Sequence, residues 1–149
     1  MRSLLKVVAT SAVLIVLVPA APAWAKQWEV KMLNRGATGP MVFEPAFIKI
    51  APGDSVKFVA SDKSHNAESI PGLIPAGAAP FKGKMNEDIV VPFSKPGLYA
   101  YKCLPHMGMG MVGIVEVKSA GNKDDLAAQT AKLPPLAKAK FDKLLLQAK

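Results

Sequence analysis

Short segments in which apolar and polar residues alternate follow one another along most of the chain. In residues 27–33, for example, Trp28, Val30 and Met32 would lie on one face of a strand. Comparable runs, separated by turn sequences rich in Gly and Pro, occur at residues 47–50, 55–60, 89–93, 98–103 and 111–117. Many short strands separated by such turns are typical of a β-sandwich or a small β-barrel. We therefore expect an all-β body, in which residues 70–84, with three Pro and three Gly, form a long loop.

The C-terminal segment changes from strand-like to helical. Asn122 is placed to cap a helix that would run to Leu133, with two acidic residues in its first turn. Pro134-Pro135 would end this helix and open a second one. The apolar face of the second helix would consist of Leu136, Lys140, Phe141, Leu144 and Leu145. We expect two short helices docked on the β body; the alternative is a frayed tail.

The first 25 residues have the features of a secretory signal peptide. Arg2 and Lys6 precede the apolar run 7–18, and Ala23-Trp24-Ala25 is an A-x-A cleavage sequence. A membrane anchor is the alternative, but a spanning helix needs about 20 apolar residues. We expect cleavage after Ala25, export to the periplasm and no membrane anchor afterwards. Residues 26–149 would then form one domain, with a sandwich over 26–119 and a helical tail over 122–148.

The charge of the chain is informative about partners. The sequence has 19 Lys and Arg against 11 Asp and Glu, a net charge of +8. Loss of Arg2 and Lys6 with the signal peptide would leave 17 basic residues and a net charge of +6. An exported protein whose lysines are spread along the sequence is not expected to bind nucleic acid. An acidic protein surface is a better match, because complementary charges speed encounter.

One segment, residues 103–111, concentrates the side chains that can bind a soft metal. It contains Cys103, which is the only cysteine, His106, which is one of two histidines, and three methionines interleaved with glycine. The other histidine, His65, lies upstream. One Cys, two His and a weak axial Met are the ligands of a blue-copper electron-transfer centre. We therefore predict one copper per chain, bound by His65, Cys103, His106 and Met111.

The remaining residues of this loop have expected roles of their own. Met111 fits the axial position because it leads into the next strand, whereas Met107 and Met109 would form exposed apolar surface. Pro105 would stiffen the turn before His106. Gly108 and Gly110 would allow tight backbone turns and close approach.

Other uses of these residues fit less well. A lone cysteine can be an inert buried thiol, but the neighbouring His and Met argue for a ligand. Zinc has no use for Met, and the second cysteine that a binuclear copper centre or a c-type haem needs is missing. Nucleophilic catalysis by Cys103 and a histidine is a further alternative, although no carboxamide or acid is obviously placed to orient the histidine. We predict that the protein is not an enzyme.

The order His65-Asn66, then Cys103-Leu104-Pro105-His106, then Gly110-Met111 resembles that of the cupredoxins, the blue copper proteins that include plastocyanins and pseudoazurins. Segments 32–34 and 41–45 favour the pseudoazurins, as does the helical tail beyond the last strand. The resemblance covers nearly all of residues 27–149, without a departure at the four ligand positions.

This resemblance implies an eight-stranded Greek-key β-sandwich with two short C-terminal helices. It implies that the backbone N–H of Asn66 reaches toward the cysteine sulfur, that Met41 packs near the His106 ring and that the edge of His106 faces solvent. The implied docking surface consists of Lys63, Lys82, Lys84 and Lys102 around an apolar patch of Pro40, Pro105, Met107 and Met109. The implied partners are a copper-containing nitrite reductase and c-type cytochromes.

The sequence thus predicts a monomeric periplasmic electron carrier that serves denitrification. A periplasmic copper chaperone is the main alternative, since Met also suits Cu(I), but mere transfer of copper does not need a Cys with two His. A fragment of an oxidase or reductase is disfavoured, because no further histidine is present to build a second centre.

Overall fold

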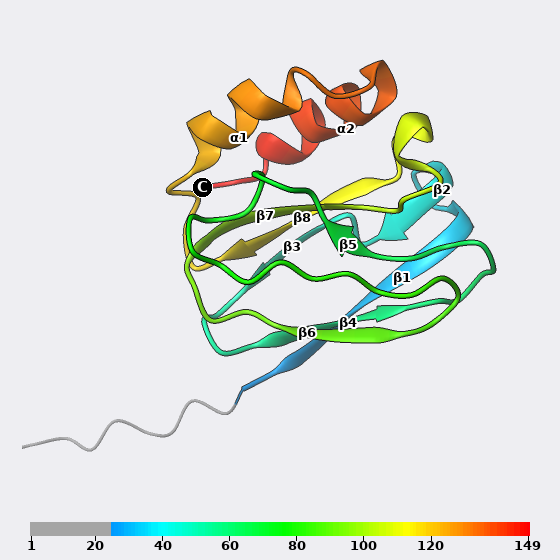
Figure 1. Ribbon diagram of the computed structural model, residues 1–149, viewed down its shortest axis with the longest axis horizontal. Coiled ribbons are helices and arrows are strands. Elements are labelled where there is room, and N and C mark those ends of the chain that lie inside the picture. Colours follow the sequence, from blue (N-terminus) through cyan, green and yellow to red (C-terminus); the bar gives the residue numbers. More distant parts are fainter. Residues whose placement is uncertain (1–24) are drawn as a thin grey trace, which may run out of the picture.

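The computed structural model describes residues 25–149, whose eight strands form two four-stranded sheets packed face to face (Figure 1). The first sheet has the strand order β2-β1-β4-β6 and the second the order β3-β8-β7-β5. The strands are β1 (Gln27–Gly36), β2 (Gly39–Glu44), β3 (Phe47–Ile50), β4 (Ser55–Val59), β5 (Glu68–Ser69), β6 (Ile89–Pro92), β7 (Gly97–Lys102) and β8 (Val112–Val117). This arrangement confirms the predicted all-β sandwich.

Strand β1 illustrates why the alternating pattern predicts the fold. Val30 and Met32 are buried between the sheets, while Glu29 and Lys31 on the opposite face are exposed. Strand β1 pairs with β2 in antiparallel and with β4 in parallel orientation. Its first residues therefore lie beside the start of β4, and its later residues approach the segment that follows β4.

Two strands have no counterpart in the sequence prediction. Strand β2 was not expected as a strand, because its sequence Gly-Pro-Met-Val-Phe-Glu begins with two residues that usually mark a turn. Strand β5 has only two residues, pairing with β7, and is too short to show any alternation. The loop predicted for residues 70–84 is present as irregular structure with turns.

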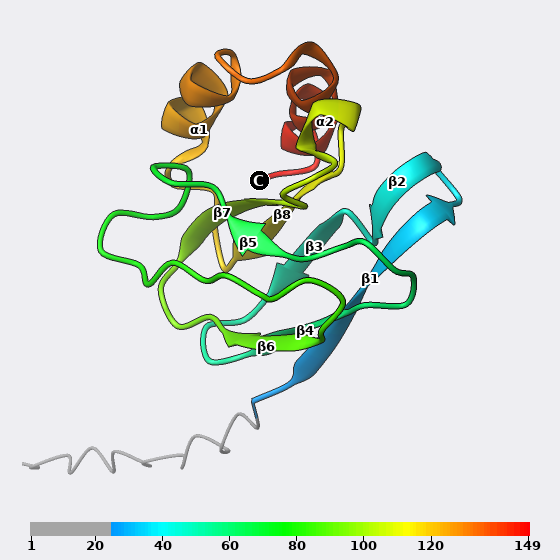
Figure 2. The same ribbon diagram turned by 45° about the vertical axis from the view of Figure 1, so that its right-hand side comes forward.

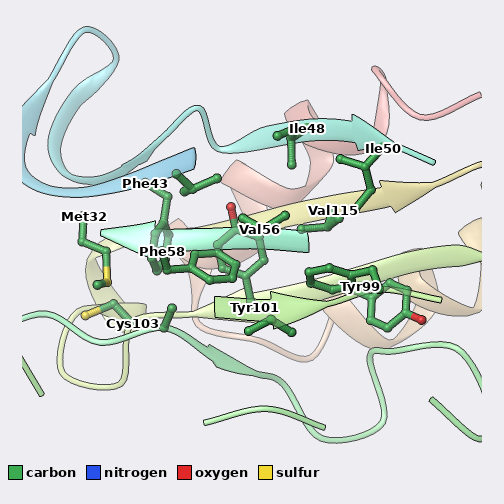
Figure 3. Close-up of a cluster of buried hydrophobic side chains, with 14 of the residues drawn as sticks. Met32, Phe43, Ile48, Ile50, Val56, Phe58, Tyr99, Tyr101, Cys103 and Val115 are labelled. Carbon is green, nitrogen blue, oxygen red and sulfur yellow. The ribbon is translucent and has the colours of Figure 1, made fainter. Parts of the chain in front are cut away.

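The second sheet is covered on both faces. Its inner face contributes Tyr99, Tyr101 and Cys103 to the core between the sheets (Figure 3). Its outer face packs Leu98 and Ala100 against helices α1 (Lys123–Thr130) and α2 (Pro135–Leu145), which lie over β7 and β8 in both views (Figures 1 and 2). Because both faces of β7 are buried, the strand that leads into Cys103 is held firmly in place.

The helices confirm the predicted tail, with two corrections. Asn122 precedes α1, but its side chain does not cap the helix. Instead, Oδ1 of Asn122 accepts a hydrogen bond from the backbone N–H of Leu98 at 2.7 Å and Nδ2 donates to the Leu98 carbonyl at 3.0 Å. In α2, Leu136 is 59% exposed and Lys140 is only half-buried, so neither belongs to the buried face. That face begins one residue later, and its members are Ala137, Phe141, Leu144 and Leu145.

Except for Ala25, the predicted signal peptide lies outside the residues that the structure describes and stays a prediction. Within residues 25–149, none of the helices has the length and apolar character needed to span a membrane.

Candidate metal centre

Three potential metal ligands converge at one end of the sandwich. Nδ1 of His65 lies 3.1 Å from Nδ1 of His106, and these atoms lie 3.7 and 3.5 Å, respectively, from Sγ of Cys103. Within residues 25–149, this is the one cluster of three or more His, Cys, Asp or Glu side chains whose donor atoms lie so close together. His65 comes after β4, whereas the other two belong to the loop between β7 and β8, so the folded sandwich is what brings them together.

The spacing of these atoms fits a metal ion. A point equidistant from the three atoms lies about 2.0 Å from each, which is the length of a metal–imidazole nitrogen bond and slightly shorter than a metal–thiolate bond. The donor set of one thiolate and two imidazoles in a trigonal arrangement is typical of an electron-transfer copper site. The residues present therefore fit copper.

His65 is fully buried, and a hydrogen bond at the ring nitrogen that faces away from Cys103 fixes the orientation of its ring. Nε2 of His65 lies 2.9 Å from Oδ1 of Asn34, which can only accept a hydrogen bond. The proton of the neutral ring is therefore on Nε2, and the lone pair of Nδ1 points toward Cys103 and His106. A hydrogen-bond acceptor at the other ring nitrogen is a usual feature of metal-binding histidines, because it fixes the tautomer and the ring orientation. The sequence does not reveal this partner, because Asn34 lies 31 residues from His65.

Cys103 is held between the core and the residue that follows His65. Its side chain is fully buried and lies with Met32 at one end of the core cluster (Figure 3). The backbone N–H of Asn66 acts on the Cys103 thiol group as a hydrogen-bond donor. The Asn66 side chain is also engaged, because its Oδ1 accepts a hydrogen bond from the backbone N–H of Leu104 at 2.8 Å. Asn66 therefore ties the His65 segment to the cysteine loop.

The loop itself is closed by backbone hydrogen bonds. The N–H of Cys103 donates to the carbonyl of Met111 at 3.0 Å, and the N–H of Met111 donates to the carbonyl of His106 at 3.1 Å. Gly110 adopts a left-handed φ of 87° at the end of the short 3₁₀ turn η1 (Met107–Met109), as expected for a close turn. Gly108 lies within this turn, but a Cβ there would meet nothing within 4 Å, so the close approach expected at Gly108 is wrong. Met111, at the end of the loop opposite to Cys103, is fully buried.

Burial governs the protonation of the two buried ligands. It lowers the pKa of His65, with the neighbouring His106 acting in the same direction and Asp62 opposing it. It raises the pKa of the Cys103 thiol; hydrogen bonds from the backbone N–H groups of Asn66 and His106 oppose this rise, and the charge of Glu68 adds to it. His65 is therefore kept neutral, and metal binding must release the proton of Cys103.

The residues predicted to surround the site differ in exposure. Lys63, Lys82 and Lys84 are exposed. Lys63 lies two residues before His65, and the segment that contains the other two lysines forms backbone hydrogen bonds with residues 65 and 67. Lys102, in contrast, has a side chain only 18% exposed, and its Nζ lies 3.4 Å from Oε1 of Glu68. Its charge is compensated inside the protein.

The predicted apolar patch is partly extended by α2. Met109 is 51% exposed, Pro105 is exposed and Met107 is half-buried. Met41, whose backbone has a left-handed φ of 48°, lines a groove together with Pro40, Met109 and Leu136. His106 is also half-buried, whereas His65 is fully buried. The packing of Met41 against the His106 ring stays a prediction.

Comparisons with known proteins agree with this site. Residues 30–118 match the family model of copper binding proteins of the plastocyanin/azurin family. A pseudoazurin of Paracoccus pantotrophus is 51% identical over 86% of this chain and 88% of its own length. The chain belongs to the pseudoazurins, within the plastocyanin/azurin family of copper-binding proteins.

Solved structures place the fold in the same group. The crystal structure of pseudoazurin from Methylobacterium extorquens AM1 superposes with a TM-score of 0.77 at 41% identity, covering 81% of this chain and 98% of that one. Native pseudoazurin from Hyphomicrobium denitrificans gives a TM-score of 0.75 at 42% identity, covering 83% and 98%.

Membership in this family has direct consequences. The protein is a blue copper protein with one copper site per chain, at which His65, Cys103, His106 and Met111 are positioned. It is an electron-transfer protein rather than an enzyme. Sequence reasoning missed Asn34 and the Glu68–Lys102 pair, because neither has a local signal: Asn34 is 31 residues from His65.

Proposed function

We propose that this protein is a mobile periplasmic carrier that passes single electrons to or from acidic redox proteins, among them a copper nitrite reductase and c-type cytochromes. The observation that carries the proposal is the asymmetry of the ligand cluster. His65 and Cys103 are fully buried, while His106 is half-buried within a loop whose Met109 is 51% exposed. Electrons would enter and leave through the His106 edge.

The ligands in this proposal have distinct roles. His65, Cys103 and His106 would form the trigonal plane, and the buried Met111 would provide a weak axial sulfur. Copper bound there would supply a one-electron Cu(II)/Cu(I) couple. The hydrogen bonds of Asn34 to His65 and of Asn66 to Leu104 would hold His65 and the cysteine loop in place in both oxidation states.

The assignment of Met111 can be tested on its own. A glutamine in its place is a harder ligand that favours Cu(II), so Met111→Gln should keep copper and lower the reduction potential. An unchanged potential would mean that Met111 is not the axial ligand. Met109→Gln is the matched control, because it alters an exposed methionine of the same loop and should leave the potential in place.

Partner docking would use the exposed lysines around the site. Three exposed lysines on the segments around His65 would attract an acidic partner: Lys63, Lys82 and Lys84. Lys84 lies 3.8 Å from Glu87 in a solvent-exposed pair, which leaves most of its charge available. Lys102 contributes less in this proposal, since Glu68 neutralises it. We expect weak, transient docking and a monomer in solution.

The experiment is a stopped-flow measurement of electron transfer with a copper nitrite reductase and with an acidic c-type cytochrome. Lys82→Glu should slow the bimolecular rate at low ionic strength, and the difference should shrink as salt increases. Lys95→Glu is the matched control, because Lys95 is an exposed lysine in the turn before β7, at the opposite end of the sandwich. Equal effects of both variants would exclude a specific docking surface, and no electron transfer from the reduced protein would exclude the carrier function.

A further inference from the structure

A nearly buried ion pair includes Lys102, the residue that precedes the cysteine ligand. Glu68 in β5 and Lys102 in β7 are cross-strand neighbours, and Nζ of Lys102 lies 3.4 Å from Oε1 of Glu68. Their side chains are only 10% and 18% exposed. Removing two charges from water is unfavourable unless each compensates the other. Lys102 is also the residue immediately before Cys103. A change in the net charge of this pair would therefore alter the electrostatic potential at the metal site.

The pair is connected to the cysteine loop through Asn66. The second oxygen of Glu68, Oε2, accepts a hydrogen bond from Nδ2 of Asn66 at 3.2 Å. Nδ2 of Asn66 also donates to the carbonyl of Gly83 at 3.2 Å, and Oδ1 accepts from the N–H of Leu104 at 2.8 Å. Asn66 is thereby held between His65, the ligand that precedes it, and Leu104, the residue that follows Cys103. Glu68 thus positions a residue that adjoins two of the metal ligands.

The two charges of this pair would act on the copper site in opposite directions. An uncompensated Glu68 carboxylate would disfavour the gain of an electron at the site, because like charges repel. Conversely, an uncompensated Lys102 ammonium would favour the reduced state.

We propose that the Glu68–Lys102 pair is a positioning and charge-balancing element, in which each charge offsets the effect of the other on the reduction potential of the copper site. The proposal rests on the proposed electron-carrier function. Reduction adds one electron and no proton to the site, so a net charge close to Cys103 changes its free energy directly. With both members present the two charges nearly cancel at the sulfur, and Asn66 stays in place.

The test is a double-mutant cycle on the copper-loaded protein, read out as the reduction potential. Lys102→Met keeps the aliphatic stem and removes the positive charge, so the remaining carboxylate should shift the potential downward. Glu68→Gln keeps an oxygen that can accept from Asn66 and removes the negative charge, so the potential should shift upward. The double variant should return close to the unmodified protein, and Lys102→Arg, which keeps the charge, should do the same.

A similar ion pair in the same sheet provides the matched control. Lys49 of β3 and Glu116 of β8 are cross-strand neighbours with Nζ and Oε1 3.3 Å apart, and the Glu116 side chain is only 4% exposed. On β8, Val112 is the residue that pairs with Lys102. Glu116 lies four residues further along this strand, which places it about 13 Å from Val112. Lys49→Met should therefore leave the potential unchanged, although it also breaks a cross-strand pair.

The outcomes separate this proposal from the function on which it rests. Shifts of opposite sign that cancel in the double variant support it. Shifts of the same sign, or shifts no larger than that of Lys49→Met, would overturn it, because they indicate only loosened packing. The free energy of unfolding of the metal-free variants provides a second readout. If Glu68 and Lys102 show a coupling free energy in unfolding but no opposite shifts of the reduction potential, the pair is purely structural. An unmodified protein without a reversible potential would instead refute the electron-carrier function.

Discussion

At the end of the sandwich where β1 and β4 begin, the carboxylate of Asp54 accepts hydrogen bonds from the backbone N–H groups of Lys26 and Ala51 and from Nε1 of Trp28, at 2.8–3.1 Å. At the other end, the donor atoms of His65, Cys103 and His106 face one another. At the first end the carboxylate is satisfied by donors from the surrounding protein, whereas at the second end the three ligand atoms contact one another at 3.1–3.7 Å. A thiolate and two imidazoles that converge in this way are suited to hold a metal ion between them.

The largest expected difference between the two ends is the response to copper. A ligand that binds only the folded state stabilises it by about 4 kcal/mol at a thousandfold excess over its Kd. Addition of Cu(II) should therefore raise the free energy of unfolding by that order, as measured by denaturant titration. Asp54→Asn should show a lower baseline and the same increment, because distant sites are nearly additive. Loss of the increment in Asp54→Asn would contradict the separation of the two ends.

The Asp54 end should be the one that is sensitive to acid. The hydrogen bond from Trp28, followed by that from the Lys26 N–H, holds the pKa of Asp54 below its usual value. A carboxyl group with a lowered pKa stabilises the fold above the pKa of the unfolded chain, about 3.9, and this contribution is lost as the pH falls through the folded-state pKa. Asp54→Asn should cost about 3 kcal/mol at pH 7, since it leaves buried donors unpaired.

The pH dependence provides the check on that prediction. The stability difference between the unmodified protein and Asp54→Asn should shrink as the pH falls below about 4. The visible spectrum of the copper-loaded protein at pH 7 should be the same for both. A constant difference across this pH range would mean that the charge of Asp54 is not what stabilises this end.

A smaller effect is expected from Asn34, which supports the copper end from outside. Asn34→Ala removes the acceptor for Nε2 of His65, and loss of such a partner usually weakens metal binding 10–100-fold. Asn34 is exposed, so the stability of the metal-free protein should change little. Asn122→Ala is the opposite case: it should lower the stability through lost contacts with Leu98 and leave copper affinity unchanged. Competition titration with a copper chelator measures both affinities.

The smallest effect concerns two tyrosines of β7, one nearer each end (Figure 3). The hydroxyl of Tyr99 donates to the Lys95 carbonyl at 2.8 Å, whereas the buried hydroxyl of Tyr101 has no hydrogen-bond partner among residues 25–149. Tyr99→Phe should cost about 1 kcal/mol. Tyr101→Phe should cost nothing or be slightly stabilising, because it removes an unpaired buried group. A clear loss of stability in Tyr101→Phe, measured by denaturant unfolding, would contradict the conclusion that the Tyr101 hydroxyl is an unpaired buried group.

How much the sequence predicts differs between these regions for physical reasons. The ligand loop is contiguous, so the spacing from Cys103 to Met111 and the scarcity of histidine suffice to predict the site. The strand pattern predicts β1 because its two faces meet different environments. The position of Leu136 was mistaken because Ala137 at the next position continues the same helical spacing and packs more closely.

Other features depend on pairing between distant segments. Asn34 reaches His65 only because β1 runs parallel to β4. Glu68 meets Lys102 only through the two-residue strand β5, which no local pattern reveals. The fit of Tyr101 likewise requires a glycine on the neighbouring strand, because a Cβ at Gly113 would overlap the Tyr101 ring and hydroxyl. Sequence spacing therefore identifies the metal ligands, and the folded structure is needed to identify the residues that hold and tune them.

The most direct test of a redox-active copper bound by Cys103 is the visible absorption spectrum of the protein reconstituted with Cu(II), recorded before and after addition of dithionite, with Cys103→Ser as the control. We expect an intense blue charge-transfer band that bleaches on reduction, returns in air and is absent from Cys103→Ser. A colourless or pale protein that still binds copper would contradict it, because no bond between the Cys103 thiolate and Cu(II) would have formed.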